Sequence, residues 1–160
     1  MNPSFREILE LLNKYQVEYI VVGGVAAVIQ GAPVTTFDLD ALVRIDEENA
    51  NRLADALEDL NARYREHESV IRPTREDILA GGHLLLITRA GPLDVLGFIG
   101  DNLRYEDLID VSPEVEMTIG TFRVLDLEEL IRQKRATDRP KDRAVLELLE
   151  EVLRRRRGAE

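Results

Sequence analysis

The chain has 160 residues, of which 44% are hydrophobic and 32% charged, a composition typical of one globular domain spanning residues 1–160. It contains no cysteine, which excludes disulfides, thiolate metal sites and a cysteine nucleophile. Its 31 acidic residues outnumber its 21 basic residues, which argues against nucleic-acid binding through broad electrostatics. Because no apolar run is long enough to span a membrane and no signal-peptide pattern is present, we expect a cytoplasmic protein.

The first half of the chain alternates between helical and extended patterns. Apolar residues at helical spacing predict helices over about 4–15 and 47–61, the second capped by Asp46. An apolar run over 18–22 is typical of a buried strand. It is followed by Gly23-Gly24, a short helical segment at 25–30, and a second strand that opens at residue 38.

The second half of the chain predicts two hairpins and two further helices. After a polar stretch at 62–73, with an edge strand expected near Val70-Ile71, Thr74 and Asp77 resemble a capping box. The remaining predicted elements are antiparallel strands 83–88 and 93–98 joined through 89–92, a second hairpin of 114–119 with 122–125 turning at Gly120, a helix from the Asp126/Glu129 capping box to about Ala136, a break at Asp138-Arg139-Pro140, and a last helix at 141–156.

These elements predict an α+β fold. We expect a mixed, largely antiparallel sheet flanked by helices, with the C-terminal helices packed on the same domain.

Two carboxylates open the second strand. Asp38 and Asp40 are separated by Leu39, so they share a face of the strand about 6.6 Å apart. Two like charges fixed side by side at the start of an apolar strand repel each other and resist burial. A divalent cation between them would remove both penalties, and a site that is only structural remains an alternative.

A third carboxylate, Asp94, lies inside the apolar run Leu93–Leu96. Either it faces the surface on an edge strand, or it is paired or bound to metal, because lone buried carboxylates are rare. If its strand neighbours that of Asp38, three carboxylates share one pocket. Oxygen ligands without His or Cys favour Mg²⁺ or Mn²⁺ over zinc.

Two further features suggest a ligand with phosphate groups. Gly23-Gly24, between a strand and a helix, would let the backbone approach a ligand closely, although a plain tight turn is the simpler interpretation. Lys134 continues the apolar face of its predicted helix, where a lysine either reaches solvent or meets an anion. The basic residues between Arg132 and Arg157 are interpreted either as a solvated helix end or as a phosphate-binding edge.

The order of these motifs resembles the DNA polymerase β-like nucleotidyltransferase superfamily. The resemblance rests on Gly23-Gly24, thirteen intervening residues and Asp38-Leu39-Asp40, then on the segment 91–96. The tail, with Leu130-Ile131, Lys134-Arg135-Ala136 and Arg139-Pro140-Lys141-Asp142, is similar to small bacterial nucleotidyltransferases of the minimal and abortive-infection toxin type.

The resemblance implies specific roles for these residues. Asp38, Asp40 and Asp94 would be catalytic and hold the metal, and Gly23, Gly24, Thr36 and Lys134 would contact the nucleotide. Two positions depart from the family pattern: Val34 stands where many relatives have Arg, and Gln30 where many have His.

The resemblance implies an Mg²⁺- or Mn²⁺-dependent enzyme that moves an NMP from an NTP to a hydroxyl of a protein, a tRNA or a small molecule. It also implies a role as the toxin of a toxin–antitoxin pair, with a separately encoded antitoxin. Val34 motivates the alternative of a non-catalytic module that binds a nucleotide or a partner on the same fold.

Overall fold

The computed structural model describes residues 3–137 and 139–159, so Asp138 of the expected chain break lies outside the described residues. The strands are β1 (Tyr19–Val22), β2 (Leu39–Val43), β3 (Arg63–Tyr64), β4 (His83–Thr88), β5 (Gly91–Leu96), β6 (Glu114–Met117) and β7 (Gly120–Val124). The helices are α1 (Pro3–Lys14), α2 (Gly23–Ile29), α3 (Glu47–Asp59), α4 (Arg75–Leu79), α5 (Tyr105–Leu108) with a 3₁₀ turn (Ile109–Val111), α6 (Leu127–Thr137) and α7 (Pro140–Ala159).

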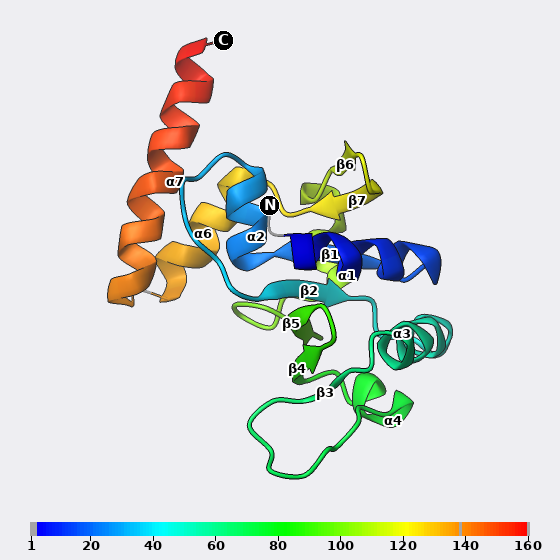
Figure 1. Ribbon diagram of the computed structural model, residues 1–160. Coiled ribbons are helices and arrows are strands. Elements are labelled where there is room, and N and C mark those ends of the chain that lie inside the picture. Colours follow the sequence, from blue (N-terminus) through cyan, green and yellow to red (C-terminus); the bar gives the residue numbers. More distant parts are fainter. Residues whose placement is uncertain (1–2, 138, 160) are drawn as a thin grey trace.

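The strands form one sheet in the order β3-β4-β5-β2-β1-β7-β6 (Figure 1). The pairs β1–β7 and β2–β5 are parallel, and the other four pairs are antiparallel. The predicted α+β class, with a mixed and largely antiparallel sheet, is therefore confirmed.

The helices pack in two groups around this sheet. In one group α6 contacts both α2 and α7, and in the other α3 contacts both α1 and α4 (Figure 1). All four residues of β1 are buried, as expected for a strand covered on both faces. Among the described residues, no helix is both long and apolar enough to cross a membrane.

Strands β4 and β5 are buried on one face only. Leu84 and Leu86 of β4 are buried, whereas Leu85 between them is 44% exposed. This alternation follows from the two-residue period of a strand. The same face that exposes Leu85 also carries Asp94, because these two residues are opposed in the β4–β5 pair.

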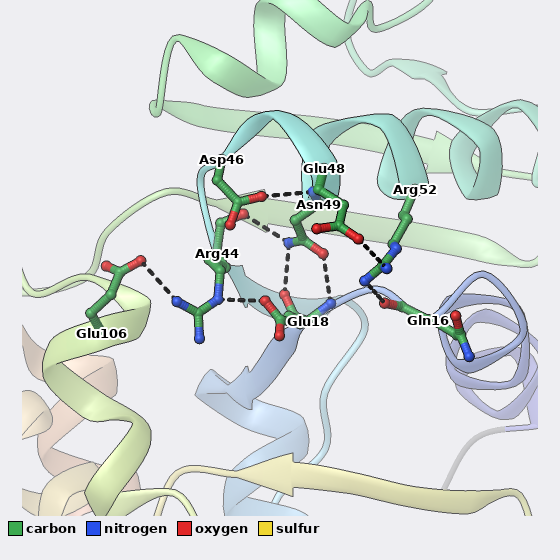
Figure 2. A network of polar contacts seen from close by, with 8 residues as sticks. All are labelled: Gln16, Glu18, Arg44, Asp46, Glu48, Asn49, Arg52 and Glu106. Atoms are coloured by element: carbon green, nitrogen blue, oxygen red, sulfur yellow. Dashed lines mark hydrogen bonds and ion pairs between the residues drawn. The ribbon is translucent and has the colours of Figure 1, made fainter.

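A buried amide fixes the end of the β1–β2 pair that lies away from the glycines. Asn49 of α3 donates to the carbonyl oxygens of Glu18 and Arg44 at 3.0 and 2.8 Å and accepts from the Glu18 N–H at 2.7 Å (Figure 2). Asp46 caps α3 as predicted, through a hydrogen bond from the Asn49 N–H. Because these bonds hold the chain just before β1 and just after β2, they support the register that places Asp40 opposite Val22.

The edge strand expected at Val70-Ile71 is wrong. The strand lies instead at Arg63–Tyr64, and Val70 and Ile71 are 62% and 43% exposed in the wide loop between β3 and α4 (Figure 1). A single contact, from the Tyr64 N–H to the Ile71 carbonyl oxygen at 2.9 Å, joins this loop to β3. Two β-branched or aliphatic residues favour extended structure, but this one hydrogen bond to β3 does not make a strand pair.

The first hairpin is tighter than expected. Strand β5 begins at Gly91 and ends at Leu96, so the turn contains only Arg89 and Ala90. The Thr88 hydroxyl closes this turn by donating to the Gly91 carbonyl oxygen and accepting from the Ala90 N–H. The second hairpin also forms, with Gly120 already inside β7.

Of the two capping boxes predicted in the second half, the first forms in full, and the second forms only its cap, because the Asp126 N–H donates to the Val111 carbonyl oxygen. The Thr74–Asp77 capping box is complete, and the Asp126 side chain accepts from the Glu129 N–H at 2.9 Å at the start of α6. The short helix α5 and its 3₁₀ turn were not expected, because four residues are too few to show a helical period.

Candidate active site

The sheet brings the three predicted carboxylates together. Asp40 and Asp94 are directly opposed in the parallel β2–β5 pair, and Asp38 lies one residue before β2. Each of the three offers an oxygen atom, and these atoms all lie within 4.8 Å of one another. All three side chains are half-buried. The strand of Asp94 therefore lies next to the strand that Asp38 precedes, which was the condition for three carboxylates to share one pocket.

The environment of Asp40 and Asp94 disfavours their charged forms. Burial, followed by repulsion from Asp94 and then Asp38, raises the pKa of Asp40 to about 7. Burial likewise raises the pKa of Asp94, although the Arg65 guanidinium opposes the shift. The cluster therefore has an excess of negative charge that nearby residues compensate only in part.

The two glycines are packed directly against this cluster. A Cβ on Gly23 would overlap the carboxylate of Asp40, and one on Gly24 would overlap the hydroxyl of Thr36. Gly23 also has a φ of +65°, which favours glycine. Sequence had suggested a turn before the helix, but the glycines are themselves the first two residues of α2. Their small size is what allows α2 to approach the acids.

Thr36 and the two residues that depart from the family pattern, Val34 and Gln30, lie between α2 and β2. The Thr36 hydroxyl donates to the Asp38 carbonyl oxygen at 3.2 Å, within the segment that leads into β2. Val34 is half-buried and packs against the core. The Gln30 side-chain amide donates to the Leu125 carbonyl oxygen at 3.0 Å, so Gln30 ties α2 to the segment before α6.

A cavity of about 200 Å³ adjoins the carboxylates. Asp40 and Gly23 lie on its wall together with Lys134 and Thr137 of α6 and with Arg139, which directly precedes α7. Lys134 therefore meets the same cavity as Asp40, and its charge opposes the rise in the pKa of Asp40. A larger hollow of about 460 Å³, between α3 and the segment before α4, has Glu58 as its one acid and contains none of the predicted site residues.

Lys134 also contacts an anion that belongs to the chain. Its ammonium group lies 3.1 Å from Asp142 Oδ1, and Arg139 Nε lies 2.6 Å from Asp142 Oδ2. The Thr137 hydroxyl donates to the same carboxylate at 2.8 Å. Sequence reasoning noted Asp142 only as a member of the tail motif, and no local pattern identified it as the partner of Lys134.

Arg65 is a site residue that sequence reasoning missed. Its guanidinium donates to Asp94 Oδ1 at 2.6 Å, and both side chains are largely shielded from solvent. It follows β3 directly, and its N–H bonds to the Leu85 carbonyl oxygen at 3.0 Å. Arg65 stands in a polar stretch without periodicity, 29 residues before Asp94, so only the strand pairing reveals the contact.

The remaining candidates lie elsewhere. His67 and His83 are exposed, and the His83 ring packs on Phe98 with centroids 4.6 Å apart. At the end of α7, Arg154 and Arg155 pair with Glu151, and Arg157 pairs with Glu128. These contacts agree with the interpretation of the basic tail as a solvated helix end.

The chain shares its fold with solved structures of nucleotidyltransferases, which confirms the fold that the sequence resemblance predicted. The lincomycin-bound structure of the lincosamide antibiotic adenylyltransferase LnuA is similar to this chain, with a TM-score of 0.66, 15% identity, and coverage of 95% of this chain and 98% of that one. No model of a protein family matches the sequence, and no curated protein matches it.

Two other solved structures share the fold. A candidate nucleotidyltransferase from Thermotoga maritima, TM1012, has a TM-score of 0.56 and 20% identity, covering 98% of this chain and 91% of that one. The antibiotic-resistance factor ANT(2'')-Ia has a TM-score of 0.56 and 16% identity, covering 99% and 96%. At these identities the likeness establishes the fold.

Proposed function

We propose that this protein is an Mg²⁺-dependent nucleotidyltransferase that moves an NMP from an NTP to the hydroxyl of an acceptor. The observation that carries this proposal is the cluster of Asp38, Asp40 and Asp94, whose oxygens lie within 4.8 Å of one another in a nucleotidyltransferase-type fold.

The donor set suits a hard divalent cation. It consists of carboxylate oxygens, which Mg²⁺ and Mn²⁺ prefer. The raised pKa values of Asp40 and Asp94 indicate that a bound cation would stabilise their charged forms. Asp38, Asp40 and Asp94 would hold the metal. When bound, the metal would neutralise charge on the triphosphate and on the reacting phosphoryl group.

The residues around the acids would bind the phosphates. Gly23 and Gly24 let the start of α2 pack against Asp40 and Thr36, because a Cβ at either position would overlap those side chains. Lys134 and Arg139 add positive charge to the wall of the adjoining cavity. This arrangement supports a triphosphate that lies between α2 and α6, in the absence of an arginine at Val34.

Asp94 is the candidate for the proton-accepting group. In the proposed reaction the acceptor oxygen attacks the α-phosphorus, the bond to the pyrophosphate oxygen breaks, and the hydroxyl proton passes to Asp94. The ion pair with Arg65 favours the charged form of Asp94 that this role requires. The open sheet face at Leu85, opposite Asp94 in the pairing, leaves space for an acceptor.

A small hydroxylated molecule is the first acceptor to test. Two structures of this fold are named as an antibiotic adenylyltransferase bound to lincomycin and as an antibiotic-resistance factor. A protein side chain or a tRNA end is the other acceptor class, and transfer to either one would support a toxin with its own antitoxin.

The test is label transfer from each of the four α-labelled NTPs with Mg²⁺, using hydroxylated antibiotics, tRNA and cell protein as acceptors. The wild type should transfer label, and a variant with Asp38→Ala and Asp40→Ala should lose at least about a thousandfold in rate. Glu151→Gln, which removes an exposed acid of α7, is the matched control and should behave as the wild type.

Absence of transfer with all these donors and acceptors would sink the enzyme proposal. Retained NTP binding would then favour the non-catalytic module. If neither Mg²⁺ nor any NTP shifts the melting temperature, the acids are only a structural feature, since a ligand at a hundred times its Kd stabilises by about 2.7 kcal/mol.

A further inference from the structure

Asp142 is a buried carboxylate that the proposed reaction does not use. It is the third residue of α7 and is only 1% exposed. Its two oxygens accept from Lys134, Arg139 and Thr137, at 3.1, 2.6 and 2.8 Å. Lys134 and Thr137 belong to α6, and Arg139 directly precedes α7, so the Asp142 side chain connects the two helices beside the cavity.

These contacts leave donors available. A lysine ammonium has three N–H donors, and among the described residues Lys134 directs one of them at Asp142. Arg139 donates to Asp142 through Nε, and a guanidinium has two Nη groups besides. Lys134 and Arg139 carry two positive charges against the one negative charge of Asp142. Both also line the cavity that contains Asp40 and Gly23. The group therefore presents a net positive charge and unused donors beside the carboxylate cluster.

We infer that Asp142 is a positioning residue, which holds Lys134 and Arg139 side by side to receive the two phosphates that leave as pyrophosphate. This inference rests on the proposed function, because it assigns the leaving phosphates to the α6–α7 side of the same site.

The physical reason is the freedom of long cationic side chains. Lysine and arginine each lose about 2 kcal/mol of rotamer entropy when fixed in one geometry. The Arg139 side chain is 58% exposed, so its surroundings alone do not restrict it. A buried carboxylate that accepts one hydrogen bond from each cation restricts both before the ligand arrives, which lowers the cost of binding.

A purely structural role is the competing explanation. An acid in the first turn of a helix stabilises that helix, and Asp142 also joins α6 to α7. That role predicts lower stability for Asp142→Asn with unchanged affinity for phosphate. The positioning role predicts lower affinity as well, even in protein that remains folded.

The experiment measures the binding of inorganic pyrophosphate, with Mg²⁺, by calorimetry at a temperature where circular dichroism shows every variant folded. Asp142→Asn should weaken binding about tenfold, a typical size for a positioning residue outside the first contact layer. Thr137→Val, which removes one neutral donor to Asp142 and leaves both cations, should weaken it by about half as much on a logarithmic scale.

Glu150→Gln is the matched control. It breaks the Arg135–Glu150 ion pair, which also joins α6 to α7 but lies outside the cavity lining. It should bind pyrophosphate as the wild type does. In a double-mutant cycle, Asp142→Asn should have little further effect once Lys134→Gln is present, because the two act together.

Unchanged or tighter binding by both Asp142→Asn and Thr137→Val would overturn the inference, since Asp142 would then be structural or a competitor of the phosphates. Equal weakening by Glu150→Gln would overturn it too, as would a wild type that does not bind pyrophosphate. Because the readout is binding, the two proposals can fail separately. If pyrophosphate binding depends on Asp142 but the wild type transfers no label, the inference is supported and the proposed function is not.

Discussion

Two groups of shielded acids differ in how their charge is balanced: one includes Asp40, which lines the cavity, and the other is Asp142, which contacts the lining residue Lys134. Among the described residues, Asp38, Asp40 and Asp94 share one direct ion pair, that of Asp94 with Arg65, and the pKa of Asp40 rises to about 7. Asp142 alone receives two cations and a hydroxyl, and these hydrogen bonds overcome the effect of burial to lower its pKa to about 2.

The contrast separates an acid that serves the fold from acids that cost it stability. Asp142 gains more from its partners than it loses by burial, so its charge stabilises the protein. The charge at Asp40 destabilises it unless a cation is added from outside. A cluster that is unfavourable without a ligand is typical of a functional site.

The largest expected effect on stability is that of Asp40→Asn. The pKa of Asp40 is raised in the folded state, so ionisation costs stability as pH rises from about 4 to about 7. Without metal at pH 8 the variant should be more stable than the wild type by about 2–4 kcal/mol, and the difference should vanish near pH 4. Urea unfolding in EDTA across this range measures it, and a less stable variant at pH 8 would contradict the expectation.

The next effect concerns the approach of α2 to the acids. Gly23→Ala should lower NMP transfer about a hundredfold, because its Cβ would displace the Asp40 carboxylate. Gly81→Ala is the control, since Gly81 has a φ of +77° but open space around its Cβ. It should lose stability through backbone strain and keep its response to Mg²⁺ in thermal unfolding. Equal loss of transfer in both variants would show that strain alone explains the effect.

Asp142→Asn should act in the opposite direction to Asp40→Asn. The pKa of Asp142 is lowered in the folded state, so its stabilising contribution is present above about pH 4 and is lost as pH falls towards 2. At pH 7 the variant should be less stable by about 2 kcal/mol. The same unfolding series measures this difference, and a stabilised variant would remove the contrast between the two groups.

The smallest expected effect is that of Arg65→Gln. It removes the ion pair of Asp94 and should lower stability without metal by about 1 kcal/mol. Because the cluster then has more uncompensated negative charge, Mg²⁺ should raise the melting temperature of the variant more than that of the wild type. A smaller rise would mean that Arg65 supports cation binding instead of substituting for the cation.

Sequence predicted the part of the site that depends on local pattern. Asp38, Asp40 and Asp94 stand at or inside apolar strands, and Gly23-Gly24 stands between a strand and a helix, so each candidate can be recognised from the few residues around it. Their convergence needed the parallel β2–β5 pairing, which depends on strand order and is not written in either segment.

The rest depends on contacts between distant segments. Arg65 reaches Asp94 through two successive strand pairings, β3–β4 and β4–β5, and nothing in its own neighbourhood indicates this partner. Lys134 contacts an anion, which is one of the two alternatives expected for a lysine on an apolar helix face. That anion is Asp142 of the same chain. The strand at Val70-Ile71 failed because apolar residues in an exposed loop look the same in sequence as those of an edge strand.

The most direct measurement of the central claim is Mn²⁺ binding followed by electron paramagnetic resonance, with Mn²⁺ in place of Mg²⁺. The wild type and Asp142→Asn should both take up the ion, and Asp40→Asn should lose most of that uptake. Uptake that is absent from the wild type, or equal in the wild type and Asp40→Asn, would contradict a cation site at the three carboxylates.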